Sequence, residues 1–284
     1  MPPPAALLTR FLRRASNGLR SKLAPVPEIT AELWLHTVHQ FPFLAALTIE
    51  DQSKLRAISA LFLQQKEFTG AHGMKVTDEM AVAIAAQACL PLLHWGNPSK
   101  ALDWYDDFVG IVVHPAEAVA IRQSTDGAGI SHQYRQVLLG EAMQRGPVML
   151  VWPAVASAGR DPEDASSVVI HEFIHKIDMK EGTANGHPPL PTGFAGTTSA
   201  GRARKLWSST WTQAYEAFRE KVIIAQRFGG EKPWLNTYGA SAPEEFLAVT
   251  CEAYFVQRNR FAEEFPTLAP LLDAFFRPDE IRSA

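Results

Sequence analysis

The chain has 284 residues, of which 46% are hydrophobic and 20% are charged, and its formal net charge is -3. This composition is typical of a globular chain with a core and excludes a disordered or fibrous one, while the near-neutral charge argues against direct nucleic-acid binding by broad phosphate neutralisation. The two cysteines, Cys89 and Cys251, are too few for a disulfide framework or a thiolate zinc cluster, so we expect a reducing, cytoplasmic setting.

Residues 1–28 are expected to form a basic and flexible leader. Five basic side chains fall within residues 1–25, and no acidic residue precedes Glu28. The segment lacks the apolar run and cleavage site of a secretory signal, and it is far from the 18 apolar residues of a membrane-spanning helix. We therefore expect neither export nor stable membrane insertion. Weak contact with an anionic membrane or a partner is the alternative role for this leader.

Residues 29–280 are expected to form a single domain that begins with helices. Thr48 is a typical N-cap, and acidic residues follow it in the first turn of a helix expected to run through Gln65. A second helix, at roughly 78–94, is so rich in alanine and leucine that we expect it to be buried on nearly every side.

Three later segments have the features of β-strands. Residues 104–113 are rich in β-favouring side chains, residues 130–139 follow a turn-forming sequence, and residues 147–152 are mostly apolar. The sequence contains no glycine-rich phosphate loop, which argues against nucleotide-dependent chemistry. The expected fold class is therefore α+β, a mainly helical domain with a small mixed β-sheet beside the helix described next.

The most informative segment contains the motif HExxH, from His171 to His175. Residues four apart lie on one face of a helix, so the two imidazoles can hold one metal ion, and zinc fits such a pair best. Glu172 leans toward the same face, where it can accept a proton from water activated by the metal.

The surroundings of the motif make a chance match less plausible. Apolar residues precede and interleave with the motif, so most of this helix is expected to be buried. Burying two imidazoles and a carboxylate without partners would cost several kcal/mol, which a bound cation would offset. We expect the helix to be capped by Asp161 and to stop at Gly182.

A catalytic zinc site also needs a third protein ligand and an open position. Ser241 and Glu244 have the spacing of a capping box, which gives Glu244 a role at a helix start and leaves Glu245 as the ligand. Glu252 lies two turns further on the same face, where it either hydrogen-bonds to a ligand or forms a buried ion pair. Asp178 either orients an imidazole or caps the end of its helix.

These motifs resemble those of the Mlc titration factor A proteins, a family of bacterial zinc metallopeptidases. The resemblance extends over about residues 34–278 and rests on four segments, which are residues 62–66, 146–152, 171–178 and 243–255. It implies a zincin-like domain with a catalytic core similar to the anthrax lethal factor protease domain. It also implies aminopeptidase-like cleavage of peptide substrates and interaction with the glucose-responsive repressor Mlc.

The resemblance assigns roles to individual residues. It makes His171, His175 and Glu245 the ligands of one zinc ion per chain, and Glu172 the general base. It adds His132 as a further metal-site residue, although a lone histidine on a strand is more often structural.

Tyr238 matches a family tyrosine that points at the scissile carbonyl, where it would stabilise the oxyanion. The residues alone leave open the alternative of a buried tyrosine with a bonded hydroxyl. We also expect the strand at 147–152 to present its edge to an extended peptide.

Two other functions remain open from the sequence. The chain is alternatively a non-catalytic anti-repressor that binds Mlc stoichiometrically, and an apolar stripe within residues 261–276 is a candidate surface for a partner, with helix packing as the other interpretation. A structural zinc protein is the third possibility, and it would need a closed coordination shell.

Overall fold

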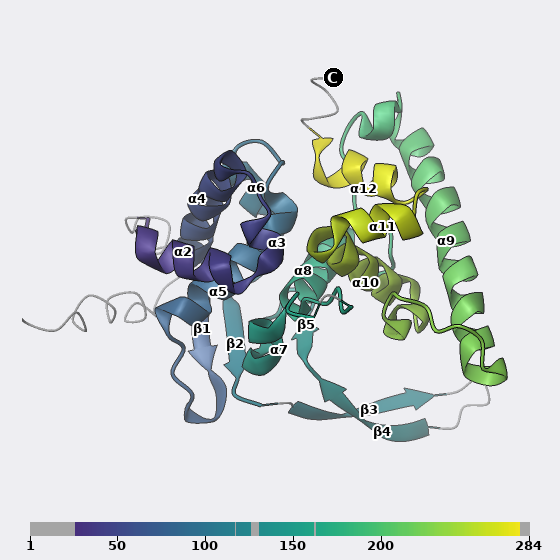
Figure 1. The fold of residues 1–284 in the computed structure, drawn as a ribbon, viewed down its shortest axis with the longest axis horizontal. Coiled ribbons are helices and arrows are strands. Elements are labelled where there is room, and N and C mark those ends of the chain that lie inside the picture. Colours follow the sequence, from purple (N-terminus) through teal and green to yellow (C-terminus); the bar gives the residue numbers. More distant parts are fainter. Residues whose placement is uncertain (1–25, 117, 126–130, 162, 279–284) are drawn as a thin grey trace, which may run out of the picture.

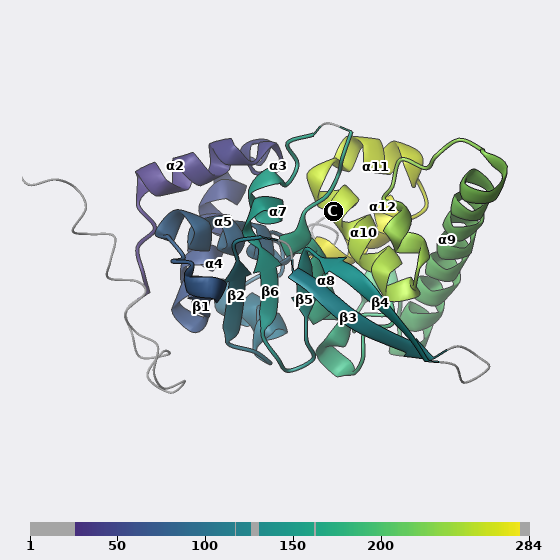
Figure 2. The ribbon, with the colours of Figure 1, turned by 90° about the horizontal axis from the view of Figure 1, so that it is seen from below.

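The computed structural model describes residues 26–116, 118–125, 131–161 and 163–278. Helices α2 to α6 lie on one side of the molecule and α9 to α12 on the other, with α8 between them; the small β-sheet extends from the first group of helices toward α8, with β5 nearest to it (Figures 1 and 2). The expected class is confirmed, because the domain is mainly helical and contains a small mixed sheet. Most of the predicted leader lies outside the described residues, and the single domain at 29–280 stays a prediction.

The first group of helices follows the sequence signals closely. The side chain of the N-cap Thr48 accepts a hydrogen bond from the backbone N–H of Asp51, and α4 ends at Gln65 as predicted. Helix α5 is buried on nearly every side, but a 3-10 turn that contains Pro91 replaces its predicted last turn. The helices of this group are α2 (Ala31–Gln40), α3 (Pro42–Ala45), α4 (Ile49–Gln65), α5 (Asp78–Cys89) and α6 (Pro98–Ala101).

The four-stranded sheet has the order β1-β2-β6-β5, in which only β5 runs antiparallel to its neighbour. Two further strands form a separate antiparallel hairpin, which Figure 2 shows extending past the end of β5 toward α9. The strands are β1 (Glu67–Gly70), β2 (Gly110–His114), β3 (Ala118–Thr125), β4 (Ser131–Leu138), β5 (Gly140–Ala142) and β6 (Val148–Val151).

The predicted strands need three corrections. The segment 104–113 is extended only from Gly110, because Tyr105 belongs to a 3-10 turn and its hydroxyl donates a hydrogen bond to the buried Ala88 carbonyl. The segment 130–139 contains β4, but this strand belongs to the hairpin. The segment 147–152 contains β6, which lies between β2 and β5 and therefore has no free edge to offer a peptide.

The remaining helices are α8 and those that follow or adjoin it. The apolar stripe within residues 261–276 belongs to the core, since Phe261 and Leu272 are fully buried. The interpretation of this stripe as a partner surface is therefore wrong. No helix in the described part of the chain is both long enough and apolar enough to cross a membrane. The helices are α7 (Trp152–Ser157), α8 (Val168–Asp178), α9 (Ala200–Phe228), α10 (Pro243–Val256), α11 (Arg258–Glu264) and α12 (Ala269–Phe276).

An aromatic cluster fixes α8 against the first group of helices. The ring of Phe173 is fully buried, and its centroid lies 5.6 Å from that of Phe62, 4.9 Å from Tyr105 and 5.9 Å from Phe108. Burial of such a ring stabilises the fold by about 2–3 kcal/mol relative to exposure. The helix that carries HExxH is therefore held rigidly in the centre of the domain.

Candidate metal centre

Helix α8 begins later than the sequence predicts. Its N-cap is Ser167, whose hydroxyl accepts a hydrogen bond from the Ile170 backbone N–H at 3.2 Å. The predicted cap, Asp161, instead accepts from the Glu163 N–H in a turn before the helix. The predicted end is close to the observed one, because α8 runs to Asp178 and a 3-10 turn then leads to Gly182.

The two motif histidines project from one face of α8, as their spacing predicts. Their rings are 4.8 Å apart between centroids, and their Nε2 atoms are 3.2 Å apart. Both side chains are largely shielded from solvent, with 13% of His171 and 12% of His175 exposed.

Glu245 completes the group from the first turn of α10, which packs against α8. Its Oε2 lies 3.0 Å from His171 Nε2 and 3.3 Å from His175 Nε2. The predicted capping box at the start of α10 is wrong, since the Ser241 hydroxyl donates to the Tyr238 carbonyl and the N-cap position is Ala242. Glu245 nevertheless takes the position that the sequence predicts for the third ligand.

The three facing atoms fit a metal ion. Their separations of 3.0, 3.2 and 3.3 Å match the edge of about 3.3 Å expected of a tetrahedron with metal–ligand bonds near 2.0–2.1 Å. In a neutral His171 ring, Nδ1–H donates to Glu252, so Nε2 carries a lone pair that faces the Glu245 carboxylate. Two acceptors this close need a proton or a cation between them. The donor set suits a metal ion, and His171, His175 and Glu245 are the described residues that meet in this way.

Glu252 orients His171 from the side opposite the three facing atoms. Its Oε1 lies 2.7 Å from His171 Nδ1, and its Oε2 accepts a hydrogen bond of 2.6 Å from the Ser167 backbone N–H. The Ser167 hydroxyl in turn donates to Gln87 Oε1 on α5 at 2.8 Å. Glu252 therefore bonds directly to His171, and a carboxylate in this position fixes the orientation of the imidazole ring.

The charges in the centre are strongly coupled. Burial alone would lower the pKa of His171, but Glu252 and Glu245 outweigh it and the pKa of His171 rises well above its usual value. Burial would raise the pKa of Glu245, yet the two histidines hold it well below its usual range. The carboxylate is therefore ionised and ready to bind a cation.

Glu172 lies under strand β5. A Cβ atom on Gly140 would lie 2.6 Å from its Oε1, so β5 approaches the carboxylate as closely as a residue without a side chain allows. Glu172 is 5% exposed, and burial raises its pKa despite the opposing charges of His171 and His175. A buried carboxylate beside His171, His175 and Glu245 is suited to exchange protons with a substrate.

The other predicted site residues, Tyr238, Asp178 and His132, differ in where the structure places them. Tyr238 lies beside the centre, with its ring centroid 6.1 Å from that of His171, and at 42% exposure it is not the buried tyrosine that the sequence left open. Asp178 caps no helix end, since its Oδ2 accepts hydrogen bonds from the backbone N–H groups of Asn185 and Gly186. His132 lies on β4, where the side chains are outside the described part of the structure.

An ion pair that the sequence did not reveal holds α8 against the segments that precede β2 and follow β5. The fully buried ammonium of Lys176 lies 2.6 Å from Asp107 and donates to the Met143 carbonyl at 3.0 Å. Lys176 follows His175 directly, so this pair limits the rotation of the helix that presents the histidines. A lysine inside an otherwise apolar helical stripe was the available signal for such a contact.

Replacing Glu252 with glutamine is expected to weaken metal binding by about 10- to 100-fold. Glutamine has one oxygen and one NH₂ group, so it cannot accept both the Ser167 N–H and the His171 Nδ1–H. Competition with a chelator of known affinity measures the effect, and Glu264→Gln on α11 is the matched control. Unchanged affinity in Glu252→Gln would contradict the orienting role.

Comparison with known proteins agrees with this geometry. The family model for the glucose-regulated metallo-peptidase M90 family matches residues 13–277, so the match begins inside the predicted leader. The chain is 32% identical over 230 residues to Mlc titration factor A of Escherichia fergusonii, which covers 80% of this chain and 79% of the relative. It is 31% identical over 241 residues to the protein of that name from Salmonella arizonae, covering 84% and 88%.

Proposed function

The chain belongs to the glucose-regulated metallopeptidase family M90, and from this premise we propose that it is a zinc-dependent peptidase with an aminopeptidase-like activity. The observation that carries the proposal is the convergence of His171 Nε2, His175 Nε2 and Glu245 Oε2 within hydrogen-bonding distance of one another. Two imidazoles and one carboxylate are a typical donor set for catalytic zinc, which keeps a further position open for water or substrate.

The residues of the chain then have separate tasks. Zinc, when bound, supplies Lewis acidity that lowers the pKa of water and polarises a peptide carbonyl. Glu172 takes a proton from the attacking water and passes it to the departing amine, since its carboxylate lies one residue from His171 and under β5. Tyr238 donates its hydroxyl proton as a hydrogen bond to the carbonyl oxygen as negative charge develops there. His132 remains a proposed further metal-site residue, by family resemblance.

The peptide would bind along β5 rather than β6. Strand β5 is an edge of the four-stranded sheet, and Gly140 on this strand lies directly over Glu172. An extended peptide that pairs with the free side of such a strand is held by its backbone, and its scissile bond is brought to the carboxylate. The absence of a side chain at Gly140 is what lets the Glu172 carboxylate lie this close to β5.

Glu245→Ala tests the proposal, with the neighbouring Glu244→Ala as the matched control. We expect the unmodified protein and Glu244→Ala to contain one zinc ion per chain and to hydrolyse an amino-acid anilide in a chelator-sensitive way. Glu245→Ala removes one of three ligands, so it should lose most of its zinc and its hydrolysis. Elemental analysis and anilide hydrolysis measure both. A protein that binds no metal after reconstitution, or a Glu245→Ala variant with full zinc, would overturn the proposal.

The names of the relatives favour a second function. They are called Mlc titration factor A, and we infer that this chain also binds an Mlc-type repressor, with or without cleavage. Binding to a transcriptional repressor agrees with the cytoplasmic setting expected from the cysteine content. Co-purification with an Mlc-type repressor tests this function, and it would be excluded by the absence of any complex at micromolar concentrations of both proteins.

A further inference from the structure

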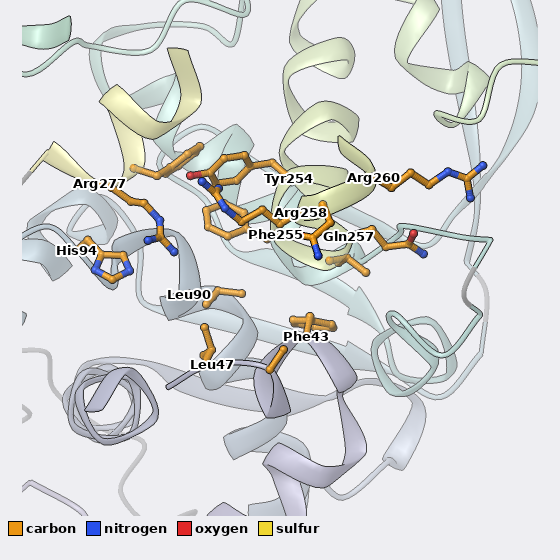
Figure 3. Close-up of a pocket in the computed structure, with 14 residues that line it drawn as sticks. Phe43, Leu47, Leu90, His94, Tyr254, Phe255, Gln257, Arg258, Arg260 and Arg277 are labelled. Atoms are coloured by element: carbon orange, nitrogen blue, oxygen red, sulfur yellow. The ribbon is translucent and has the colours of Figure 1, made fainter. Parts of the chain in front are cut away.

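A cavity lies at the opposite end of α10 from Glu245. Its volume is about 570 Å³, and its walls come from α3, the turn after α5, the junction of α10 with α11, and the end of α12 (Figure 3). Along α10, Glu245 and Val256 are separated by roughly 16 Å at 1.5 Å per residue. The cavity is therefore distinct from the candidate metal centre.

One part of the cavity wall is apolar. Figure 3 shows Leu47 and Leu90 on one side of it and Phe43 and Phe255 close by. Phe43 and Leu90 are 6% and 4% exposed, so they are fixed by packing rather than free to fill the space. A volume of this size, with fixed apolar walls, is typical of cavities that bind small organic molecules.

The charged side chains of the wall are all cationic. Arg258, Arg260 and Arg277 are among the lining residues, although Arg260 directs its guanidinium to Glu163 outside the cavity, and no aspartate or glutamate is among the described lining residues. Arginine groups that face an apolar cavity are suited to bidentate binding of a carboxylate or phosphate.

Arg258 is held in place by its neighbours. Its Nη2 lies 2.5 Å from Asp273 Oδ1, and its guanidinium lies 4.6 Å from the centroid of the Tyr254 ring. This pairing uses only part of the donor capacity of a guanidinium, which has five N–H groups. Asp273 thus orients Arg258 without lining the cavity itself.

Arg277 adds a second cation on the same side. Figure 3 shows its guanidinium beside the ring of His94, next to Leu90, whereas Arg260 points away from the cavity. Burial and Asp273 raise the pKa of the Tyr254 hydroxyl, and the charges of Arg258 and Arg277 both oppose this rise. Both guanidinium groups are therefore close enough to the Tyr254 hydroxyl for their charges to lower its pKa.

We propose that this cavity binds a small organic anion, whose carboxylate or phosphate headgroup is held by Arg258 and Arg277 and whose apolar body packs against Phe43, Leu47 and Leu90. The charge complementarity and the apolar wall together select this class of ligand over neutral or cationic molecules. The proposal needs no metal and is independent of the peptidase activity.

Isothermal titration calorimetry with three eight-carbon probes tests the proposal. Octanoate and octyl phosphate carry the two headgroups, and octanol is the neutral control with the same apolar body. We expect saturable binding of at least one anion at one site per chain, and at least tenfold weaker binding of octanol. The stronger of the two anions identifies the headgroup. Equal affinity for octanol and both anions would overturn the proposal.

Arg277→Gln locates the binding site. This change removes one charge-assisted contact, so we expect affinity for the preferred anion to fall by about 10-fold or more. Arg219→Gln makes the same charge change on the exposed surface of α9 and should leave the affinity within about twofold. Leu47→Trp fills the apolar part of the cavity and should also weaken binding. An unchanged affinity in both Arg277→Gln and Leu47→Trp would overturn the assignment.

Deletion of residues 279–284 excludes a competing occupant. These residues follow the cavity wall directly in the sequence and include Asp279 and Glu280. Binding of the probes to the full chain with similar affinity supports the proposal. Binding only after the deletion would overturn it, because the acidic end of the chain would then be the ligand of this cavity.

Discussion

Glu172→Gln is expected to lower peptide hydrolysis by about 10²- to 10⁴-fold while the variant keeps its zinc. Glutamine has nearly the same shape as glutamate but cannot accept a proton, and Glu172 is not among the three side chains that meet at the metal group. Zinc content per chain and the kcat for an amino-acid anilide measure the two effects. Glu181→Gln, at an exposed position in the 3-10 turn after α8, is the matched control.

The same variant separates the two proposed functions. If Glu172→Gln loses hydrolysis and still binds an Mlc-type repressor, catalysis and partner binding are two properties of one protein. If both are lost while the zinc remains, they share one site. Near-normal hydrolysis in Glu172→Gln would remove this residue from the role of general base.

Gly140→Ala is expected to reduce hydrolysis by about 100-fold or more, because Glu172, the proposed general base, must move. A Cβ atom at this position would lie 2.6 Å from Glu172 Oε1, 2.7 Å from its Cγ and 2.8 Å from Val168 Cγ2, and contacts this short do not occur. Glu172 is buried and has little space in which to yield. The kcat of the variant and its zinc content are the readouts.

A second glycine of the same sheet provides the control. At Gly110 an added Cβ would meet only the Pro147 side chain at 3.5 Å, an ordinary contact, so Gly110→Ala should keep its activity. Thermal unfolding of both variants shows whether the domain still folds. A folded Gly140→Ala protein with zinc and full activity would contradict the position assigned to Glu172.

The sequence predicts local features of the site well because they depend on local spacing. His171 and His175 meet because four residues complete about one turn of a helix, wherever that helix lies. The start of α8 is less predictable, since Asp161 and Pro162 have the better local signal but Ser167 also bonds to Gln87 and Glu252. Tertiary contacts thus select one of two plausible caps.

The order of the strands and the partners of several buried side chains depend on pairing across the chain, and the sequence does not reveal them. Strand β5 has only three residues and no apolar alternation, so its position at the edge of the sheet follows from its pairing with β6. The role of Glu252 likewise requires knowing that α10 packs on α8. The predicted edge role of residues 147–152 fails for this reason, because strand order is a property of the sheet and not of a segment.

The ligand group joins distant parts of the chain, since His171 and Glu245 are 74 positions apart and belong to different helices. An ion bound by both helices would close the chain between them, including α9, into a loop, as a disulfide bond does. In a chain-entropy model, closing a loop of this length disfavours the unfolded ensemble by about 4 kcal/mol. Loss of the ion would then lower the free energy of unfolding of the folded chain as a whole, including the 29-residue α9.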